Sequence, residues 1–388
     1  MSLSFDSARM PNPNMTEDHH AWREALRRFI DQEIMPYAQD WDEAGHIPNE
    51  LWPKAAEIGL LGMGYPEEYG GIPADSWHSW IVNEELARIG VGGISASLMV
   101  HGIGLPPLIN WGSEAMKAEI APPVLRGESW ISLGITEPGG GSDVASLKTT
   151  AVRDGDELVV NGSKTYITGG MRANYVSTAV RTGGEGATGV SMLLIPTDAP
   201  GFSRTPLDKK MGWWASDTAT LYFDDVRVPV SNIIGEENQG FKVIMTNFNN
   251  ERMAMAANME AYGRVCLEEA VEWATQRKTF GKRLADHQVI RHKIAMMKQK
   301  LNATQAYVRA CYEAIEAGDP NAGDIALLKV QASEVMEFCA REAMQILGGI
   351  GYMRGSRVER IYREVRVNAI GGGSEEIMRD LASRQYGL

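Results

Sequence analysis

The stretch HQVIRHKIAMMKQKLNATQAYVRACYEAI, residues 287–315, limits the fold more than any other part of the sequence. Its apolar residues recur at spacings of three, four and seven, which places them on one face of a helix. They are Ile290, Ile294, Met297, Leu301, Val308, Cys311 and Ile315. A helix of about eight turns cannot bury such a face alone, and helices of this kind usually pack together. The sequence therefore predicts a helical bundle from about Gly240 onward.

The first third of the sequence is also typical of helices. The segment MTEDHHAWREALRRFIDQEIMPYAQ offers Thr16 as an N-cap, followed by the acidic residues Glu17 and Asp18. One face of this predicted helix carries Trp22, Leu26, Phe29, Ile30 and Ile34. A second apolar segment, GISASLMVHGIGLPPLINWG, predicts a buried helix that breaks near Pro106 and Pro107.

The pattern changes to short β-type runs near Ser129. In TTAVRDGDELVVNGSKTYITGG, the pairs Asp154-Gly155 and Asn161-Gly162 are hairpin signals, and VSMLLIP and TATLYFDDVRVP continue the pattern. These runs do not alternate with helices, so they predict a compact antiparallel β unit. The predicted class is α+β, with an N-terminal helical domain at 1–127, a middle β domain at 128–238 and a C-terminal helical bundle at 239–388.

Charge and cysteine content narrow the range of possible functions. With 38 Lys and Arg against 50 Asp and Glu, the net charge of −12 argues against a nucleic-acid partner, but leaves open a local basic pocket for an anionic ligand. No apolar run approaches the ~20 residues of a membrane span. Cys266, Cys311 and Cys339 lie in apolar helical contexts without metal-ligand spacing, which predicts buried, reduced thiols and no metal site. The N-terminal residues lack a secretory signal, so we expect a reducing, cytoplasmic location.

Two glycine-rich stretches are candidates for ligand loops. LGGIGYMRG (347–355) has the spacing GxGxxxG and follows a predicted helix, which does not fit the dinucleotide fingerprint of a parallel sheet. EPGGGSDV (137–144) lacks the Gly-Lys-Ser/Thr of a phosphate loop. Each stretch is either a plain turn or a loop whose bare backbone N–H groups approach a phosphate or a flavin edge.

Six segments taken together closely resemble the acyl-CoA dehydrogenase family. In chain order they are GITEPGGGSDVASLKTTA (134–151), KTYITGG (164–170), MGWWASDTATLYFDDVRVP (211–229), IIGEENQGFKVIM (233–245), QRKTFGK (276–282) and QILGGIGY (345–352). The resemblance covers nearly the whole chain and implies the same order of helical, β and four-helix-bundle domains, usually in a tetramer. It implies that FAD oxidises an acyl-CoA thioester to the trans-2-enoyl-CoA, and that electrons pass to electron-transfer flavoprotein.

The resemblance also implies the residues that contact FAD. Thr136 and Thr168 would hydrogen-bond the edge of the flavin ring, and Tyr166, where the family often has tryptophan, would cover one face. Arg277 would pair with the pyrophosphate of a neighbouring subunit's FAD, a contact that suits the arginine fork. The full implied set is Leu133, Ile135, Thr136, Gly141, Ser142, Tyr166, Ile167, Thr168, Arg277, Phe280, Gln288, Gln345, Ile346, Gly348, Gly349, Ser374 and Glu376.

The segment IGGGSEEIM (370–378) resembles the part of the family that carries a catalytic glutamate, yet Gly372 stands at that position. Glycine keeps the backbone N–H that would help to hold the thioester oxygen. In long-chain and isovaleryl-CoA dehydrogenases, which this chain resembles in NFNNERMAMAAN (247–258), the base is the glutamate of the Glu-Arg pair. This implies Glu251 as base, and Ser142, Asn249, Arg252 and Gly373 near the substrate. The alternatives Glu375 and Glu376 are typical acids of a helix start.

Two other functions stay open at this point. The first is an oxidase or monooxygenase of the same fold, which would be reoxidised rapidly by molecular oxygen. The second is a carrier of flavin or acyl-CoA without catalysis, in which Glu251 would be a structural acid. The length and branching of the acyl chain cannot be derived from the sequence, since one methylene changes discrimination by only ~1–3 kcal/mol. Similarity to the long-chain and isovaleryl type favours a long or branched chain.

Overall fold

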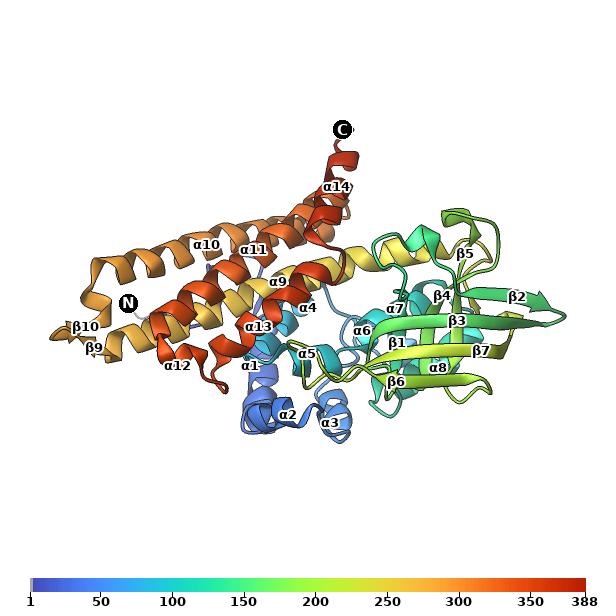
Figure 1. Cartoon of the computed structure of the whole chain (residues 1–388), viewed down its shortest axis with the longest axis horizontal. Helices are drawn as coiled ribbons and strands as arrows, with labels where there is room; N and C mark the ends of the chain where they lie inside the picture. Colours follow the sequence, from blue (N-terminus) through green and yellow to red (C-terminus); the bar gives the residue numbers. More distant parts are fainter. Residues whose placement is uncertain (1–2) are drawn as a thin grey trace.

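The computed structural model describes residues 3–388, and its elements follow the order helices, sheet, helices (Figure 1). The first group contains α1 (Glu17–Phe29), α2 (Ala38–Ala44), α3 (Leu51–Glu57), α4 (Ser76–Ala87), α5 (Gly92–Leu98), α6 (His101–Gly104), α7 (Pro106–Trp111) and α8 (Glu114–Leu125). The predicted N-cap is confirmed, because the side chain of Thr16 accepts the N–H of His19. The predicted apolar face of α1 and the following turn is buried.

The second apolar segment breaks more often than the sequence suggested. It forms α5, α6 and α7 instead of one helix with a single break, and α7 begins at Pro106. Proline suits the first turn of a helix because the N–H that it lacks would have no partner there. Helices α6 and α7 pack against the sheet, where Ser177 of a central strand donates to the carbonyl of Gly104.

The sheet contains β1 (Ile131–Gly134), β2 (Thr150–Asp154), β3 (Glu157–Thr168), β4 (Tyr175–Arg181), β5 (Val190–Pro196), β6 (Phe202–Pro206), β7 (Thr218–Pro229) and β8 (Ile233–Ile234). Its strand order is β6-β7-β3-β2-β4-β5-β8, with β1 beside β4. The predicted antiparallel β unit is confirmed for most strand pairs, but β1 pairs with β4 in parallel and β2 meets β4 in parallel. The prediction of a hairpin at Asn161-Gly162 was wrong. These residues lie inside β3 at a bulge, whereas the turn at Gly155 does join β2 to β3.

The last part of the chain is a bundle of long helices. It contains α9 (Gly240–Gln276), α10 (Gln288–Glu316), α11 (Ala322–Leu347), α12 (Gly349–Tyr352), α13 (Arg357–Ile370) and α14 (Glu375–Gln385), with a small hairpin of β9 (Lys278–Thr279) and β10 (Lys282–Arg283). The helix predicted over 287–315 is confirmed with a shift of one residue at each end. All three cysteines are free and buried, as predicted.

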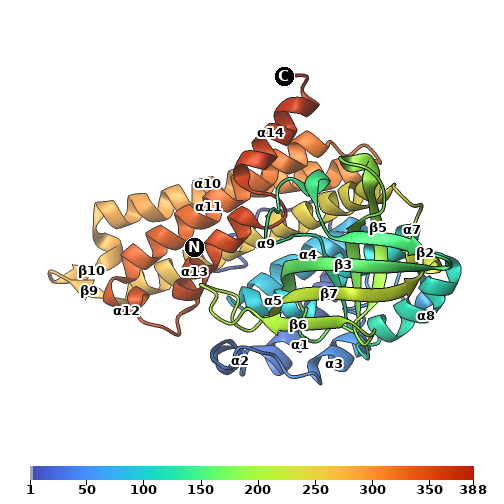
Figure 2. The same ribbon diagram turned by 45° about the vertical axis from the view of Figure 1, so that its right-hand side comes forward.

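Helix α9 connects the two halves of the molecule. Its first turns pack on β5 at the edge of the sheet, and its last turn reaches the β9–β10 hairpin at the opposite end of the bundle (Figures 1 and 2). Helices α10, α11 and α13 lie along α9, while α14 projects from the bundle. Among residues 3–388, no single helix has the length and apolar character to cross a membrane; only the bent pair Gly92–Leu98 and His101–Trp111 passes on length and composition.

Candidate active site

The loop after β1 is fixed to β3 by a buried lysine. Lys164 has no exposed surface, and its Nζ donates to the carbonyl of Ile135 at 3.1 Å and to Oε1 of Glu137 at 2.8 Å. The N–H of Thr165 donates to the carbonyl of Thr136 at 2.8 Å. The two segments that the resemblance places against a flavin are therefore held side by side.

The Lys164–Glu137 pair is ionised at neutral pH. Burial lowers the pKa of Lys164 to about 8. Burial acts to raise the pKa of Glu137, but Lys164 and backbone N–H donors outweigh it and hold this pKa at about 2. Those donors belong to Lys148 and Thr149, at 2.6 and 2.8 Å. Sequence analysis did not identify this pair. The sequence feature that could have indicated it is a lysine in the middle of a predicted strand.

Tyr166 and Thr168 lie at the open end of β3. Tyr166 is 70% exposed, whereas Ile167 between them is buried. The φ of Tyr166 is +59°, a left-handed conformation that non-glycine residues adopt rarely and that is enriched at functional sites. At Gly141, an added Cβ would lie 3.2 Å from Cγ2 of Thr136, so glycine keeps this side of Thr136 open. The ring of Tyr166, the hydroxyl of Thr136 and the loop at Gly141 thus border one surface.

The structure brings Glu251 and Gly372 together from distant parts of the sequence. Glu251 lies on α9, and Gly372 lies in the turn between α13 and α14 with a φ of +66°. A Cβ built on Gly372 would lie 3.8 Å from Oε1 of Glu251 and 2.8 Å from Sδ of Met255. The carbonyl of Gly372 accepts a hydrogen bond from Nε of Arg252 at 3.1 Å, and Arg252 also donates to Oδ1 of Asn249. The glutamate thus faces the position where a side chain is missing.

The surroundings of Glu251 favour a carboxyl group that can exchange a proton. Burial raises the pKa of Glu251, while the positive charges of Arg252 and Lys329 act in the opposite direction. Within residues 3–388, the Glu251 carboxylate accepts no hydrogen bond from the protein. A half-buried carboxylate without fixed donors keeps both oxygens available to a substrate proton.

The acids of the α14 start are engaged in other interactions. Ser333 donates its hydroxyl to Glu375 at 2.6 Å, and Arg379 lies 3.7 Å from the same carboxylate. Glu376 is exposed in the first turn, where its own backbone N–H and the Ser374 hydroxyl lower its pKa. Ser374 is the N-cap of α14. These contacts support structural roles for both acids.

Family models for the three domains match this chain in order. The model described as "Acyl-CoA dehydrogenase, N-terminal domain" matches residues 16–128, the one for the middle domain matches 132–226, and the one for the C-terminal domain matches 238–387. The chain belongs to the acyl-CoA dehydrogenase family.

Similar proteins and structures span the whole chain. "Acyl-CoA dehydrogenase AFT10-1" from Alternaria alternata is 39% identical over 97% of this chain and 93% of its own length. "Long-chain specific acyl-CoA dehydrogenase, mitochondrial" from Sus scrofa is 35% identical over 95% of this chain and 86% of its own length. The crystal structure of a probable acyl-CoA dehydrogenase from Mycobacterium abscessus has a TM-score of 0.94 at 44% identity, with 96% and 100% of the two chains covered.

As an acyl-CoA dehydrogenase, the chain is an FAD-dependent oxidoreductase that acts on acyl-CoA. The surface at the end of β3 fits a flavin, because Tyr166 presents an exposed ring while the loop after β1 is exposed at Gly141 and Ser142. The side chains of Ile135, Ile167 and Ile346 are buried, so any contact of theirs with the cofactor would come from the backbone.

Two of the remaining predicted FAD contacts, Ser374 and Glu376, lie at the start of α14, directly after Gly372 and Gly373. The others lie at the far end of the bundle. Arg277 follows the last residue of α9, 26 residues after Glu251, so the rise of the helix separates the two by about 39 Å. Glu251 and Arg277 thus lie at widely separated places along α9. Phe280 is 96% exposed on the nearby hairpin, and Gln288, Gln345, Gly348 and Gly349 are also exposed. Helix α12 lies near this hairpin in Figure 1. These residues face outward, away from the flavin-fitting surface of their own chain.

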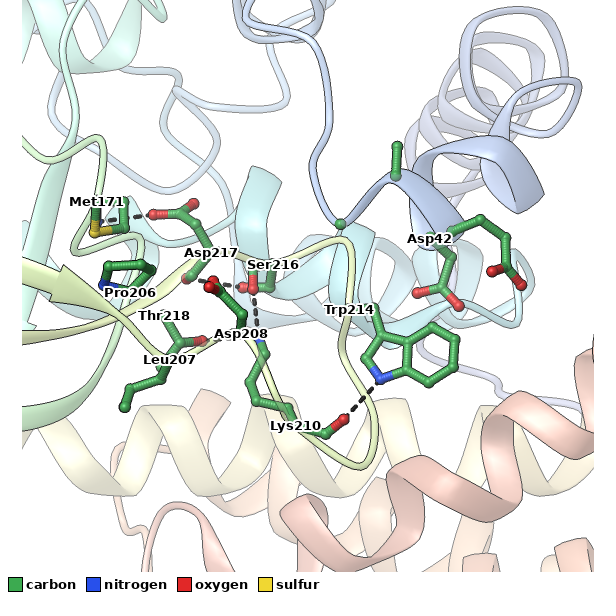
Figure 3. Close-up of a pocket in the computed structure, with 13 residues that line it drawn as sticks. Asp42, Met171, Pro206, Leu207, Asp208, Lys210, Trp214, Ser216, Asp217 and Thr218 are labelled. Atoms are coloured by element: carbon green, nitrogen blue, oxygen red, sulfur yellow. Dashed lines mark hydrogen bonds between the residues drawn. The ribbon is translucent and has the colours of Figure 1, made fainter.

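A cavity of about 480 Å³ borders the end of β3 (Figure 3). Its polar groups mostly bind one another: Lys210 donates to the carbonyl of Trp213 and the hydroxyl of Thr218, and Asp217 accepts from the N–H of Met171. Neither Glu251 nor Gly372 lines this cavity. We therefore treat it as part of the frame that holds the turn after β3, and not as the reaction site.

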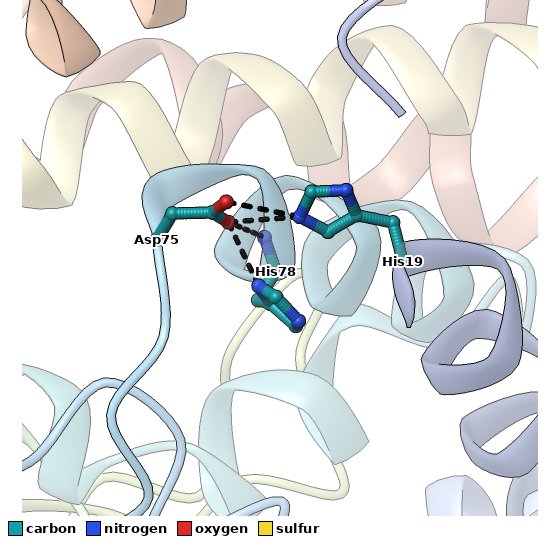
Figure 4. Close-up of side chains that lie close together, drawn as sticks. All are labelled: His19, Asp75 and His78. Carbon is teal, nitrogen blue, oxygen red and sulfur yellow. Dashed lines mark hydrogen bonds and ion pairs between the residues drawn. The ribbon is translucent and has the colours of Figure 1, made fainter. Parts of the chain in front are cut away.

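The cluster of His19, Asp75 and His78 has side-chain atoms close enough to share a metal ion (Figure 4). However, Nδ1 of His19 accepts the backbone N–H of Thr16 at 3.0 Å, so its Nε2 carries the proton and donates to Asp75. Asp75 also accepts the N–H of His78 as the N-cap of α4. A protonated nitrogen cannot ligate a metal, and the cluster is best described as a network that caps α1 and α4.

Proposed function

We propose that this acyl-CoA dehydrogenase desaturates the α,β bond of its thioester with Glu251 as the base that takes the α-proton. FAD, when bound, supplies the acceptor for the hydride that leaves the β carbon. The observation that carries the proposal is the 3.8 Å distance between Oε1 of Glu251 and the position of a Gly372 Cβ. A carboxylate on α9 thereby lies within van der Waals distance of the position of a Gly372 side chain.

The backbone N–H of Gly372 is proposed to stabilise the enolate-like thioester oxygen. A donor of this kind must be fixed before the charge develops. The carbonyl of Gly372 is held by Arg252, which cannot lose its charge at working pH and is itself bound to Asn249. Arg252 is therefore proposed to orient the turn, and Asn249 to orient Arg252.

The proposed substrate is a long or branched acyl-CoA, and the proposed electron acceptor is electron-transfer flavoprotein. The substrate class is supported by the Glu251–Gly372 pattern and by the similarity to a long-chain specific relative. The acceptor is supported by family membership and by the exposed ring of Tyr166 at the flavin-fitting surface. A screen of straight, branched and cyclic acyl-CoAs by anaerobic flavin bleaching would test the substrate class.

Glu251→Gln tests the base directly. The amide keeps the size of the side chain but cannot accept the proton, so flavin reduction should slow by about 10²–10⁴ while FAD stays bound. The matched control is Glu375→Gln, which should reduce flavin at close to the wild-type rate. Glu376→Gln is a second control and is compared at saturating FAD, because the resemblance places Glu376 among the FAD contacts. If Glu251→Gln bleaches normally and one of the controls does not, the base is the acid at the start of α14.

The same samples separate the other two functions. A carrier without catalysis would show no bleaching in the wild-type protein with any acyl-CoA. An oxidase or monooxygenase would bleach, and its reduced form would then react with oxygen faster than with electron-transfer flavoprotein in stopped-flow mixing. The dehydrogenase proposal requires the opposite order of these two rates.

A further inference from the structure

Two cationic side chains hold the turn that carries Gly372, through hydrogen bonds to three backbone carbonyls. Nζ of Lys329 donates to the carbonyl of Ala369 at 3.0 Å and to the carbonyl of Gly373 at 2.8 Å. Between these two carbonyls, the carbonyl of Gly372 accepts from Nε of Arg252 at 3.1 Å. Lys329 comes from α11 and Arg252 from α9, so two helices of the bundle fix one short turn.

Lys329 is an unusual residue for the interior of a bundle. It has no exposed surface, and within residues 3–388 no carboxylate lies within ion-pair distance of its Nζ. A buried ammonium costs more than an apolar side chain of similar size unless its hydrogen bonds or its charge are needed. One of its carbonyls, that of Ala369, belongs to the last turn of α13, where a cation also opposes the negative end of the helix.

We propose that Lys329 is a positioning residue: its two hydrogen bonds fix the turn that presents the Gly372 N–H, and its positive charge favours the ionised form of Glu251. This inference rests on the proposed function of Glu251 and Gly372. It adds a group that touches neither substrate nor cofactor and acts through both of these residues.

The charges around the turn support the second part of the proposal. Burial raises the pKa of Glu251, and Arg252 and Lys329 counteract it. Burial lowers the pKa of Lys329 to about 8, with Glu375, Glu251 and Glu376 raising it and Arg252 lowering it. These groups come from α9, α11 and α14, the elements that surround the turn. Lys329 is thus charged below about pH 8, where its charge opposes the effect of burial on the pKa of Glu251.

Three substitutions separate the hydrogen bonds from the charge. Lys329→Met removes both, Lys329→Gln keeps donors without charge, and Lys329→Arg keeps both with a different shape. The control is Lys298→Met on α10, a lysine that also donates to a backbone carbonyl, that of Ala8, but lies away from the turn. FAD content and thermal unfolding of each holoenzyme show whether the variant is folded.

Anaerobic flavin reduction is timed from pH 5 to pH 9 in each variant. Lys329→Met should slow it by about 10- to 100-fold, the scale of a lost hydrogen bond to a charged group. Its acid limb should move to higher pH by on the order of 0.5–1 unit, because Glu251 loses a stabilising cation. Lys329→Gln should recover part of the rate but keep the displaced limb, whereas Lys329→Arg and Lys298→Met should keep the wild-type limb.

A wild-type rate and limb in both Lys329→Met and Lys329→Gln would overturn the proposal. So would a loss of rate without a displaced limb, since that result describes a purely structural lysine. If Lys329→Met does not fold, the limb of Lys329→Gln decides in the same way. Glu251→Gln is measured in parallel, and activity in that variant would reject the proposed base whatever the lysine variants show.

Discussion

Glu251 and Met255 lie one turn apart on α9, and both face the turn that carries Gly372. The thioether of Met255 fills the space beside Gly372 that a side chain would need, since a Cβ there would approach Sδ to 2.8 Å. Methionine adapts well to irregular gaps, which suits this place. A side chain at position 372 would therefore require a change at Met255 as well.

Gly372→Glu should consequently fail to act as a second base. The new side chain would collide with Met255, and a φ of +66° costs a non-glycine residue about 1–3 kcal/mol. In a Glu251→Gly background, adding Gly372→Glu and Met255→Ala together should restore flavin reduction at least about tenfold over Gly372→Glu alone, or ~1.4 kcal/mol of barrier. Met255→Ala alone is the control. Equal recovery without the Met255 change would show that the methionine is not the obstacle.

The ionised carboxylate of Glu251 should also lower the free energy of unfolding at neutral pH. Its pKa is raised in the folded state, so the folded protein holds this proton more tightly than the unfolded chain does. Stability from this group is present below the unfolded pKa and is lost as pH rises through the folded pKa. Glu251→Gln should therefore stabilise the protein more at pH 8 than at pH 5. Urea unfolding at pH 5 and pH 8 measures this, with Glu376→Gln as the exposed control. An equal gain in the free energy of unfolding at the two pH values would contradict the prediction.

At the scale of elements, local patterns predicted the helices well and the sheet only in part. The apolar spacing in 287–315 and the Thr16 cap depend on neighbours along the chain, and both are confirmed. The parallel pair β1–β4 joins residues more than forty positions apart, from Ile131 to Tyr175, and no local pattern records such a pairing. Asn161-Gly162 has the composition of a turn, but pairing with β7 keeps it inside a strand as a bulge.

Some residues of the candidate site were likewise predicted from the sequence and others were missed. The resemblance supplied Glu251 and Gly372 by their positions in motifs, and the structure places them beside each other. Lys329, Met255 and the Lys164–Glu137 pair were missed, because each acts through a contact between separate elements. A lysine in an apolar run is a weak sequence signal, since many such lysines reach solvent with their flexible stems.

The Lys164–Glu137 pair should control the loop after β1. Glu137→Gln would leave the buried ammonium unpaired, which destabilises by about 3–5 kcal/mol, and should release FAD as the loop loosens. Glu137→Gln combined with Lys164→Met removes both charges, so the cost should be smaller than that of Glu137→Gln alone. Urea unfolding and FAD titration of both variants measure this. A double variant that is less stable than Glu137→Gln would mean that Lys164 acts mainly through the carbonyl of Ile135.

At the scale of the whole molecule, the predicted FAD contacts form three groups, and the smallest, Ser374 and Glu376, lies at the start of α14 beside the Gly372 turn. Thr136, Tyr166 and Thr168 lie at the sheet, and Arg277 and Phe280 lie at the far end of α9, about 39 Å from Glu251 along the helix. The ring of Phe280 and the side chains of Val289, Tyr352 and Met353 near it are exposed. We propose that this end packs on another copy of the chain and completes that copy's FAD site.

Mixing two variants tests the shared site, at an FAD concentration that leaves most sites of Arg277→Ala without cofactor. Arg277→Ala should weaken FAD binding in every site, by roughly 1.5–3 kcal/mol for a lost charge-assisted contact, and Glu251→Gln should remove the base from every site. In a mixed pair, however, one site receives Glu251 from the first variant and Arg277 from the second. Random pairing of equal amounts gives mixed pairs in about half of the dimers, so about one quarter of the wild-type sites should regain activity.

The quarter recovery follows only if each site uses residues from two chains. If Arg277 served its own chain, every site in the mixture would still lack either the arginine or the glutamate, and mixing would restore nothing. The control mixture of Glu251→Gln with Glu251→Gln/Arg277→Ala contains no complete site in either arrangement and must stay inactive. Mass measurement of differently labelled copies monitors subunit exchange. Absence of activity then contradicts the shared site only if mixed dimers have formed. A protein that sediments as a monomer with tightly bound FAD would reject the arrangement without any mixing.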